Sequence, residues 1–82
     1  LSAYTMLGAI ALQRGDAAAA VGHLERVAGG PSPPPQALYN LAGAYATLGR
    51  WDDAARTADR LARAHPQYGA FAQAVRTRTL QL

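Results

Sequence analysis

Apolar residues recur at helical spacing along most of this 82-residue chain. Near the start, Tyr4, Leu7 and Ala11 follow one another at intervals of three and four positions, and Ile10 is next to Ala11. This spacing places the four residues on one face of an α-helix. The same periodicity predicts four helices and a fifth amphipathic segment, over residues 2–14, 17–28, 36–48, 51–64 and 68–82. The sequence therefore predicts an all-α fold.

Glycine and proline separate these segments. Gly15 and Gly49 follow the first and third predicted helices, where glycine adopts left-handed backbone without steric penalty. Asp16 is expected to be the N-cap of the second helix. No helix crosses the breaker cluster at residues 29–35, and Pro66 ends the fourth helix because the residue before proline disfavours helical backbone. The order of helix, glycine turn, helix and proline break occurs twice, which predicts two helical hairpins.

The two hairpins match each other with a shift of 34 residues. Gly15 then falls on Gly49, and small Gly8 falls on small Ala42. A period of about 34 residues is typical of a helix–turn–helix solenoid. We expect Gly8 and Ala42 to lie where two antiparallel helices approach closely, because a larger side chain would force them apart.

Large and small residues exchange places between the two copies. The first copy has small Ala11 and large Leu24, whereas the second has large Tyr45 and small Ala58 at the corresponding positions. If these side chains meet within each hairpin, the volume of the core is conserved.

Residues 35–68 carry a distinctive set of core, turn and terminal residues. These are Leu38, Leu41, Ala42, Tyr45, Leu48, Gly49, Trp51, Ala54 and Pro66. The set resembles a tetratricopeptide repeat, a helical hairpin of about 34 residues. Residues 1–34 are similar, although Ala11 stands where the family usually has a large aromatic residue.

The resemblance implies a helix-turn-helix repeat solenoid of two such hairpins. The first repeat covers residues 1–34 and the second covers residues 35–68. Residues 69–82 form either a C-terminal capping helix or the start of a third repeat. Arg76 favours the cap, because a third repeat would place it at the small buried site of Gly8 and Ala42.

The resemblance also implies a concave groove, lined by the first helix of each hairpin, that binds a partner peptide or helix. The partner-binding residues carried over are Thr5, Met6, Ala9, Leu12, Gln13, Gln36, Tyr39, Asn40, Gly43 and Thr47, with Ser2 and Ala46 completing the face. None of them is charged. We expect Tyr39 and Asn40 to contribute most, Asn40 by hydrogen-bonding the backbone of a partner protein.

Family members that bind a C-terminal carboxylate use Lys and Asn pairs in neighbouring repeats. Of those positions only Asn40 matches, since Thr5 and Met6 stand where the first Lys and Asn would be. We therefore expect no carboxylate clamp.

The end of the solenoid suggests a second function. Ala37 and Ala44 are expected to pack on the preceding hairpin, but their counterparts Ala3 and Ile10 have none, so Ile10 would be exposed. Solenoids usually cover such ends with polar capping repeats. The alternative is thus a structural module that forms homo-oligomers, or spaces other domains, through its end faces.

Composition narrows the remaining classes. The chain has no cysteine, and hence no disulfide framework or thiolate metal site. It has no apolar run of about 18 residues, so we expect no membrane span. Its basic residues are all arginine, which indicates a GC-rich, bacterial coding sequence. The chain begins without an initiator Met, at Leu1 beside the first predicted helix, so we expect it to be a piece of a longer protein. Cytoplasm and periplasm are both compatible with this composition.

The sequence holds no recognisable catalytic or cofactor-binding arrangement. His23 and His65 lie on different elements without a second ligand at metal-binding spacing. No Ser/His/Asp set, pair of carboxylates or phosphate-binding loop is present. We therefore expect no enzymatic activity, no metal and no cofactor.

The arginines are interleaved with acidic residues. Asp52 with Arg56, and Asp59 with Arg63, have the i, i+4 spacing of helix-surface ion pairs. Such a pattern is typical of a solvated face. Because the expected groove is uncharged, we do not expect a nucleic-acid partner.

Overall fold

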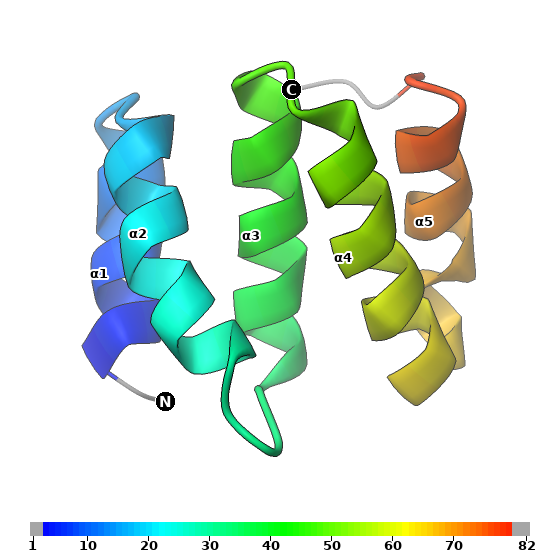
Figure 1. The fold of residues 1–82 in the computed structure, drawn as a ribbon, viewed down its shortest axis with the longest axis horizontal. Coiled ribbons are helices and arrows are strands. Elements are labelled where there is room, and N and C mark those ends of the chain that lie inside the picture. The colour runs from blue at the N-terminus through cyan, green and yellow to red at the C-terminus, as the bar shows by residue number, and fades with distance from the viewer. Residues whose placement is uncertain (1–2, 80–82) are drawn as a thin grey trace.

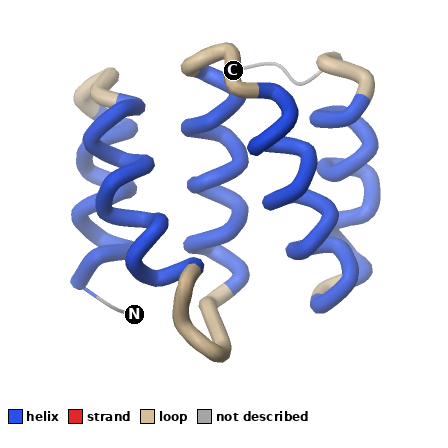
Figure 2. Tube along the Cα trace, in the orientation of Figure 1, coloured by secondary structure: helices blue, strands red, loops and turns tan. Residues whose placement is uncertain are grey.

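The computed structural model describes residues 3–79, and within that range it contains helices and connecting turns but no strand (Figures 1 and 2). The elements are α1 (Ala3–Gln13), α2 (Ala17–Ala28), α3 (Pro35–Thr47), α4 (Trp51–Ala64), the 3-10 helix η1 (Pro66–Tyr68) and α5 (Gly69–Arg76). The predicted all-α repeat fold is confirmed. The bounds of α2 and α4 are those predicted, and the predicted start of the first helix at Ser2 lies outside the described residues.

The helices stack as successive antiparallel hairpins. α1 packs against α2, and α3 packs against α4. The hairpins are joined because α2 and α1 both pack against α3, and α5 packs against α4. In Figure 1, α2 and α4 lie toward the viewer, with α1 and α5 behind them. This arrangement gives the molecule a face built from α1, α3 and α5 and an opposite face built from α2 and α4.

The two glycine turns have the same geometry. Gly15 and Gly49 both have φ of 76°, the left-handed conformation that favours glycine. After α1, the N–H of Asp16 donates to the carbonyl of Ala11 at 2.8 Å, and after α3 the N–H of Arg50 donates to Tyr45 at 2.8 Å. These bonds satisfy carbonyls at the helix ends, as in a Schellman motif. The carboxylate of Asp16 also accepts from the N–H of Ala19 at 3.0 Å, which confirms it as the N-cap of α2.

Small residues allow the close helix approach that the repeat predicts. Gly8 is buried, and a Cβ added there would lie 2.4 Å from Cγ of Leu24. Ala42 is 0% exposed in the second hairpin. Ala11, Leu24, Tyr45 and Ala58 all belong to the buried core.

The orientation of α1 differs from the expectation. The 34-residue repeat places Tyr4 and Leu7 at the core positions of Leu38 and Leu41, but they are 40% and 43% exposed, whereas α1 buries Thr5, Gly8 and Ala11. Their counterparts in α3, Leu38 and Leu41, are only 2–3% exposed. The physical difference is the number of neighbours, because α3 is enclosed by α2 and α4 while no described helix covers the outer edge of α1.

The helical segment predicted over residues 68–82 is shorter in the structure. α5 ends at Arg76. The hydroxyl of the next residue, Thr77, donates to the carbonyl of Gln73 at 3.0 Å. Arg78 has φ of 56°, and the N–H of Thr79 donates to Ala74 at 2.9 Å, which closes the helix end. Residues 80–82 of the prediction lie outside the described residues.

The register of α5 bears on its role. It begins at Gly69, 34 residues after the start of α3 at Pro35, and packs on α4. Arg76 is exposed rather than buried, and its guanidinium lies 3.3 Å from the carboxylate of Asp59. The division into residues 1–34, 35–68 and 69–82 stays a prediction.

Candidate functional site

The five candidate residues of α3 lie along one side of that helix. We call this surface the α3 face, and it consists of Gln36, Tyr39, Asn40, Gly43 and Thr47. All five are exposed or half-buried, and none carries a charge. The amide of Gln36 donates to Oδ1 of Asn40 at 3.2 Å, and the hydroxyl of Thr47 donates to the carbonyl of Gly43 at 2.9 Å. The structure therefore brings these residues together as a neutral surface.

The candidates of α1 are only partly at the surface. Met6 is 55% exposed, Gln13 is exposed, and Ala9 and Leu12 are half-buried. Thr5, however, is 2% exposed. It lies three residues before Gly8, on the same side of the helix, and Gly8 faces Leu24 of α2.

Two further positions expected on this face need separate mention. Ala46 is 5% exposed and belongs to the core, so it offers no surface to a partner. Ser2 lies outside the described residues. Among the described residues, the accessible candidates are thus those of the α3 face together with Met6, Ala9, Leu12 and Gln13 of α1.

Two aromatic residues that the sequence analysis did not place in the site lie against Tyr39. The ring centroid of Tyr39 is 4.6 Å from that of Phe71 and 5.9 Å from that of Tyr68. Phe71 stands 34 residues after Ala37, so the repeat alignment shows an aromatic side chain where the earlier copies have alanine. The change from alanine to phenylalanine was the one sign in the sequence that this position is unusual. That Phe71 contacts Tyr39 is seen only in the structure.

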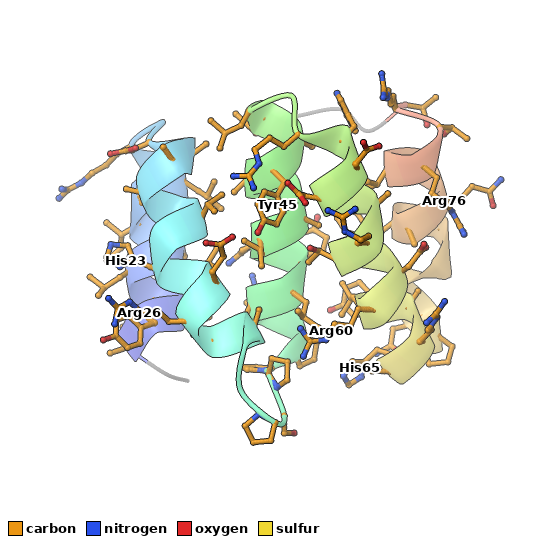
Figure 3. The ribbon with its side chains drawn as sticks, viewed as in Figure 1. His23, Arg26, Tyr45, Arg60, His65 and Arg76 are labelled. Carbon is orange, nitrogen blue, oxygen red and sulfur yellow. The ribbon has the colours of Figure 1, made fainter. Side chains whose placement is uncertain are left out.

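A polar network connects the two hairpins on the opposite side of α3. The hydroxyl of Tyr45 donates to the carboxylate of Glu25 on α2, and the guanidinium of Arg50 lies 4.7 Å from the Tyr45 ring centroid. Burial, together with the hydrogen bond to Glu25, raises the pKa of Tyr45 to about 12. Figure 3 shows Tyr45 between the two hairpins. This part-buried contact joins α2 to α3 and lies away from the α3 face.

The ion pairs of α4 differ from those expected at i, i+4 spacing. Asp53 pairs with Arg50 at 2.8 Å and also with Arg56. The hydrogen bond from Arg50 lowers the pKa of Asp53. Asp59 pairs with Arg76 of α5 rather than with Arg63.

Arg60 links the two outer helices. Its guanidinium donates to the carbonyl of Ala28, at the C-terminus of α2, at 2.7 Å (Figure 3). A cation is favourable there because carbonyl groups at the end of a helix lack intrahelical donors. The mixed charges and this structural role agree with a solvated outer surface.

The histidines make ring contacts in the structure. The His23 ring stacks beside Tyr4 at 6.4 Å, and the His65 ring meets Tyr68 edge-on at 6.5 Å. Among residues 3–79, no group of three or more His, Cys, Asp or Glu side chains is arranged to hold a metal ion. Over the same range, no helix has the length and apolar character needed to cross a membrane.

Comparison with known proteins agrees with this architecture. A family model described as tetratricopeptide repeat matches residues 11–78, which is most of the chain. Searches of curated proteins and of solved structures gave no significant match. Tetratricopeptide repeats generally mediate protein–protein interactions and are typically non-catalytic scaffolds. The family match, carried by stacked helical hairpins with equivalent glycine turns, shows that this chain belongs to the tetratricopeptide repeat family.

Proposed function

We propose that the chain binds a peptide or helix of a partner protein on the α3 face, as part of a larger bacterial scaffold. The observation that carries this proposal is Tyr39, a large aromatic side chain that is 42% exposed in the middle of an uncharged surface. Tyrosine is favoured at interfaces because it combines a flat apolar ring with a hydroxyl. Asn40 lies beside it and supplies amide groups for a partner backbone.

Neighbouring apolar groups on α1 extend the proposed surface. α1 packs against α3, and Met6, the most exposed large apolar residue of the molecule as described, lies on α1. Methionine adapts its shape to different apolar partners. An uncharged partner segment therefore suits this surface better than an acidic or basic one.

Peptide display tests this function directly. A random peptide library is selected on the immobilised 82-residue chain, and the selected peptides are titrated by fluorescence anisotropy. Tyr39→Ala is expected to weaken binding by about tenfold or more, the effect of removing a central aromatic anchor. Tyr4→Ala is the matched control, because Tyr4 is equally exposed, at 40%, but lies on the outer edge of α1. Selected peptides that bind both variants like the wild type would contradict the proposal.

A second candidate function is self-association through the outer edge of α1. Tyr4, Leu7 and Ile10 are 40–43% exposed and form one stripe along the helix. The corresponding α3 positions, Leu38, Leu41 and Ala44, are buried, and α3 packs against both helices of the preceding hairpin. Leu7 and Ile10 of the stripe line a surface depression, together with Ala19 and His23 of α2 and with Arg14 and Asp16 at the turn between the helices. A second helical hairpin seated there would bury the apolar residues.

Sedimentation at increasing protein concentration tests the second candidate. If the α1 edge mediates self-association, the wild type forms dimers and Ile10→Glu sediments as a monomer, because a buried carboxylate at the interface has no partner. Met6→Glu is the control and should leave the dimer intact. A wild type that stays monomeric throughout would exclude this function and leave the peptide-binding proposal unaffected.

A further inference from the structure

An aromatic patch joins three helical elements beside the α3 face. We define it as Tyr39 of α3, Tyr68 of η1 and Phe71 of α5. Tyr39 is 42% exposed, and the other two rings are half-buried and pack against the core. Two rings are thus held in place by the protein, while the third offers its surface to solvent. Ordered aromatic rings lose little conformational entropy when a ligand packs on them.

The polar groups around the patch are available as hydrogen-bond donors. Within residues 3–79, the hydroxyls of Tyr39 and Tyr68 have no hydrogen-bond partner. Oδ1 of Asn40 accepts from Gln36, which leaves the two N–H groups of the Asn40 amide for a ligand. A ligand that carries free carbonyl groups would satisfy these donors.

Two other kinds of ligand fit the surroundings of the patch less well. Its sequence neighbours on the same elements are uncharged, namely Gln36, Asn40, Gly43, Gln67 and Ala70. A cationic side chain would be attracted to the rings but would find no carboxylate among these residues. An amphipathic helix needs apolar anchors over several turns, whereas Gln36 and Asn40 interrupt the apolar surface next to Tyr39.

We propose that the aromatic patch binds a proline-rich segment of a partner protein in the polyproline II conformation. This inference rests on the proposed function of the α3 face and specifies its ligand. Proline rings are uncharged and pack on aromatic rings, and a polyproline II helix is already ordered before binding. It has no internal hydrogen bonds, so its carbonyl groups are free to accept hydrogen bonds from the donors around the patch.

A labelled decaproline peptide tests the inference on the complete 82-residue chain by fluorescence anisotropy. The wild type is expected to bind decaproline and not a Gly-Ser peptide of equal length. Tyr39→Ala should weaken binding by about tenfold or more. Tyr39→Phe, which keeps the ring and loses the donor, should weaken it less. Tyr4→Ala should bind like the wild type, and circular dichroism should show all variants to be helical.

The outcomes separate this inference from the function on which it rests. If decaproline fails to bind, or Tyr39→Ala binds it unchanged, the inference is overturned. Display-selected peptides that still depend on Tyr39 would then keep the proposed function, whereas peptides independent of Tyr39 would overturn both.

The chain itself contains a second source of proline. Residues 31–35 hold four of its five prolines, and Pro34 has φ of −65° and ψ of 148°, the polyproline II region. This loop projects below the helices in Figure 1. A wild type that dimerises, with dimers lost in Pro33→Ala and competed by decaproline, would overturn a partner protein as the source and assign the site to a second copy. A monomeric wild type that binds decaproline supports the proposal.

Discussion

Gly8→Ala is expected to destabilise the chain by about 1–3 kcal/mol, the usual cost of overpacking a core. Its Cβ would lie between 2.4 and 2.9 Å from three carbon atoms of Leu24. Leu24 is 0% exposed, so its side chain has no free space into which to move. The steric cost therefore exceeds the gain of about 1 kcal/mol that alanine brings to a helix interior. Urea unfolding followed by circular dichroism measures the difference.

Gly22→Ala is the matched control. Gly22 lies inside α2, and a Cβ there meets nothing within 4 Å. The substitution should stabilise the chain by about 0.5–1 kcal/mol through helix propensity alone. The double variant Gly8→Ala/Leu24→Ala should lose less unfolding free energy than the two single variants lose together, because alanine at position 24 removes the clash. A Gly8→Ala variant as stable as Gly22→Ala would show that the two helices do not depend on close contact at Gly8.

The repeat was readable from sequence because its signals are local. A glycine with left-handed backbone, such as Gly15 or Gly49, ends a helix through bonds to residues a few positions away. Asp16 likewise caps α2 through a contact three residues on. The 34-residue spacing of these signals then gives the order of the hairpins.

Burial of α1 could not be predicted with the same success. Its apolar residues lie on more than one side of the helix. Apolar Leu7 is exposed and polar Thr5 is buried, the reverse of what their side chains suggest. The repeat pattern predicts Leu7 inside because Leu41 is inside. The burial of Leu41, however, depends on the helices packed around α3, and α1 has fewer neighbouring helices than α3 has. Burial is a property of the assembled neighbours, which periodicity alone does not specify.

The candidate site shows the same division. Its neutral character follows from the identities of Tyr39, Asn40 and the other α3 residues. The aromatic patch could be identified only from the three-dimensional structure, because Phe71 and Tyr39 lie on two different helices, α5 and α3. The ion pair of Asp59 is similar, since its partner Arg76 lies on another helix rather than one turn away.

Tyr45→Ala is expected to destabilise the chain by about 3–5 kcal/mol, the range for removing a large buried aromatic side chain. Tyr45 is 7% exposed, packs in the core and bonds to Glu25 of the neighbouring hairpin. Such a loss is a large part of the total stability of a small domain, which is about 0.05–0.15 kcal/mol per residue. Tyr45→Phe keeps the ring and removes only the hydroxyl, so it should cost about 1 kcal/mol. Equal unfolding midpoints for the alanine and phenylalanine variants would contradict a packing role for the ring.

The Tyr45 hydroxyl should also make stability depend on pH in the alkaline range. Its pKa in the folded chain is about 12, against about 10 for an unfolded tyrosine. A raised pKa means that the neutral form stabilises the fold fully below about pH 10, and that this contribution is lost as the pH rises through about 12. The stability advantage of the wild type over Tyr45→Phe should therefore shrink between these pH values, because the variant has no group there to ionise. Tyr4→Phe, which changes an exposed tyrosine, should follow the wild type. Parallel losses of stability in the wild type and Tyr45→Phe would contradict a raised pKa for Tyr45 in the folded chain.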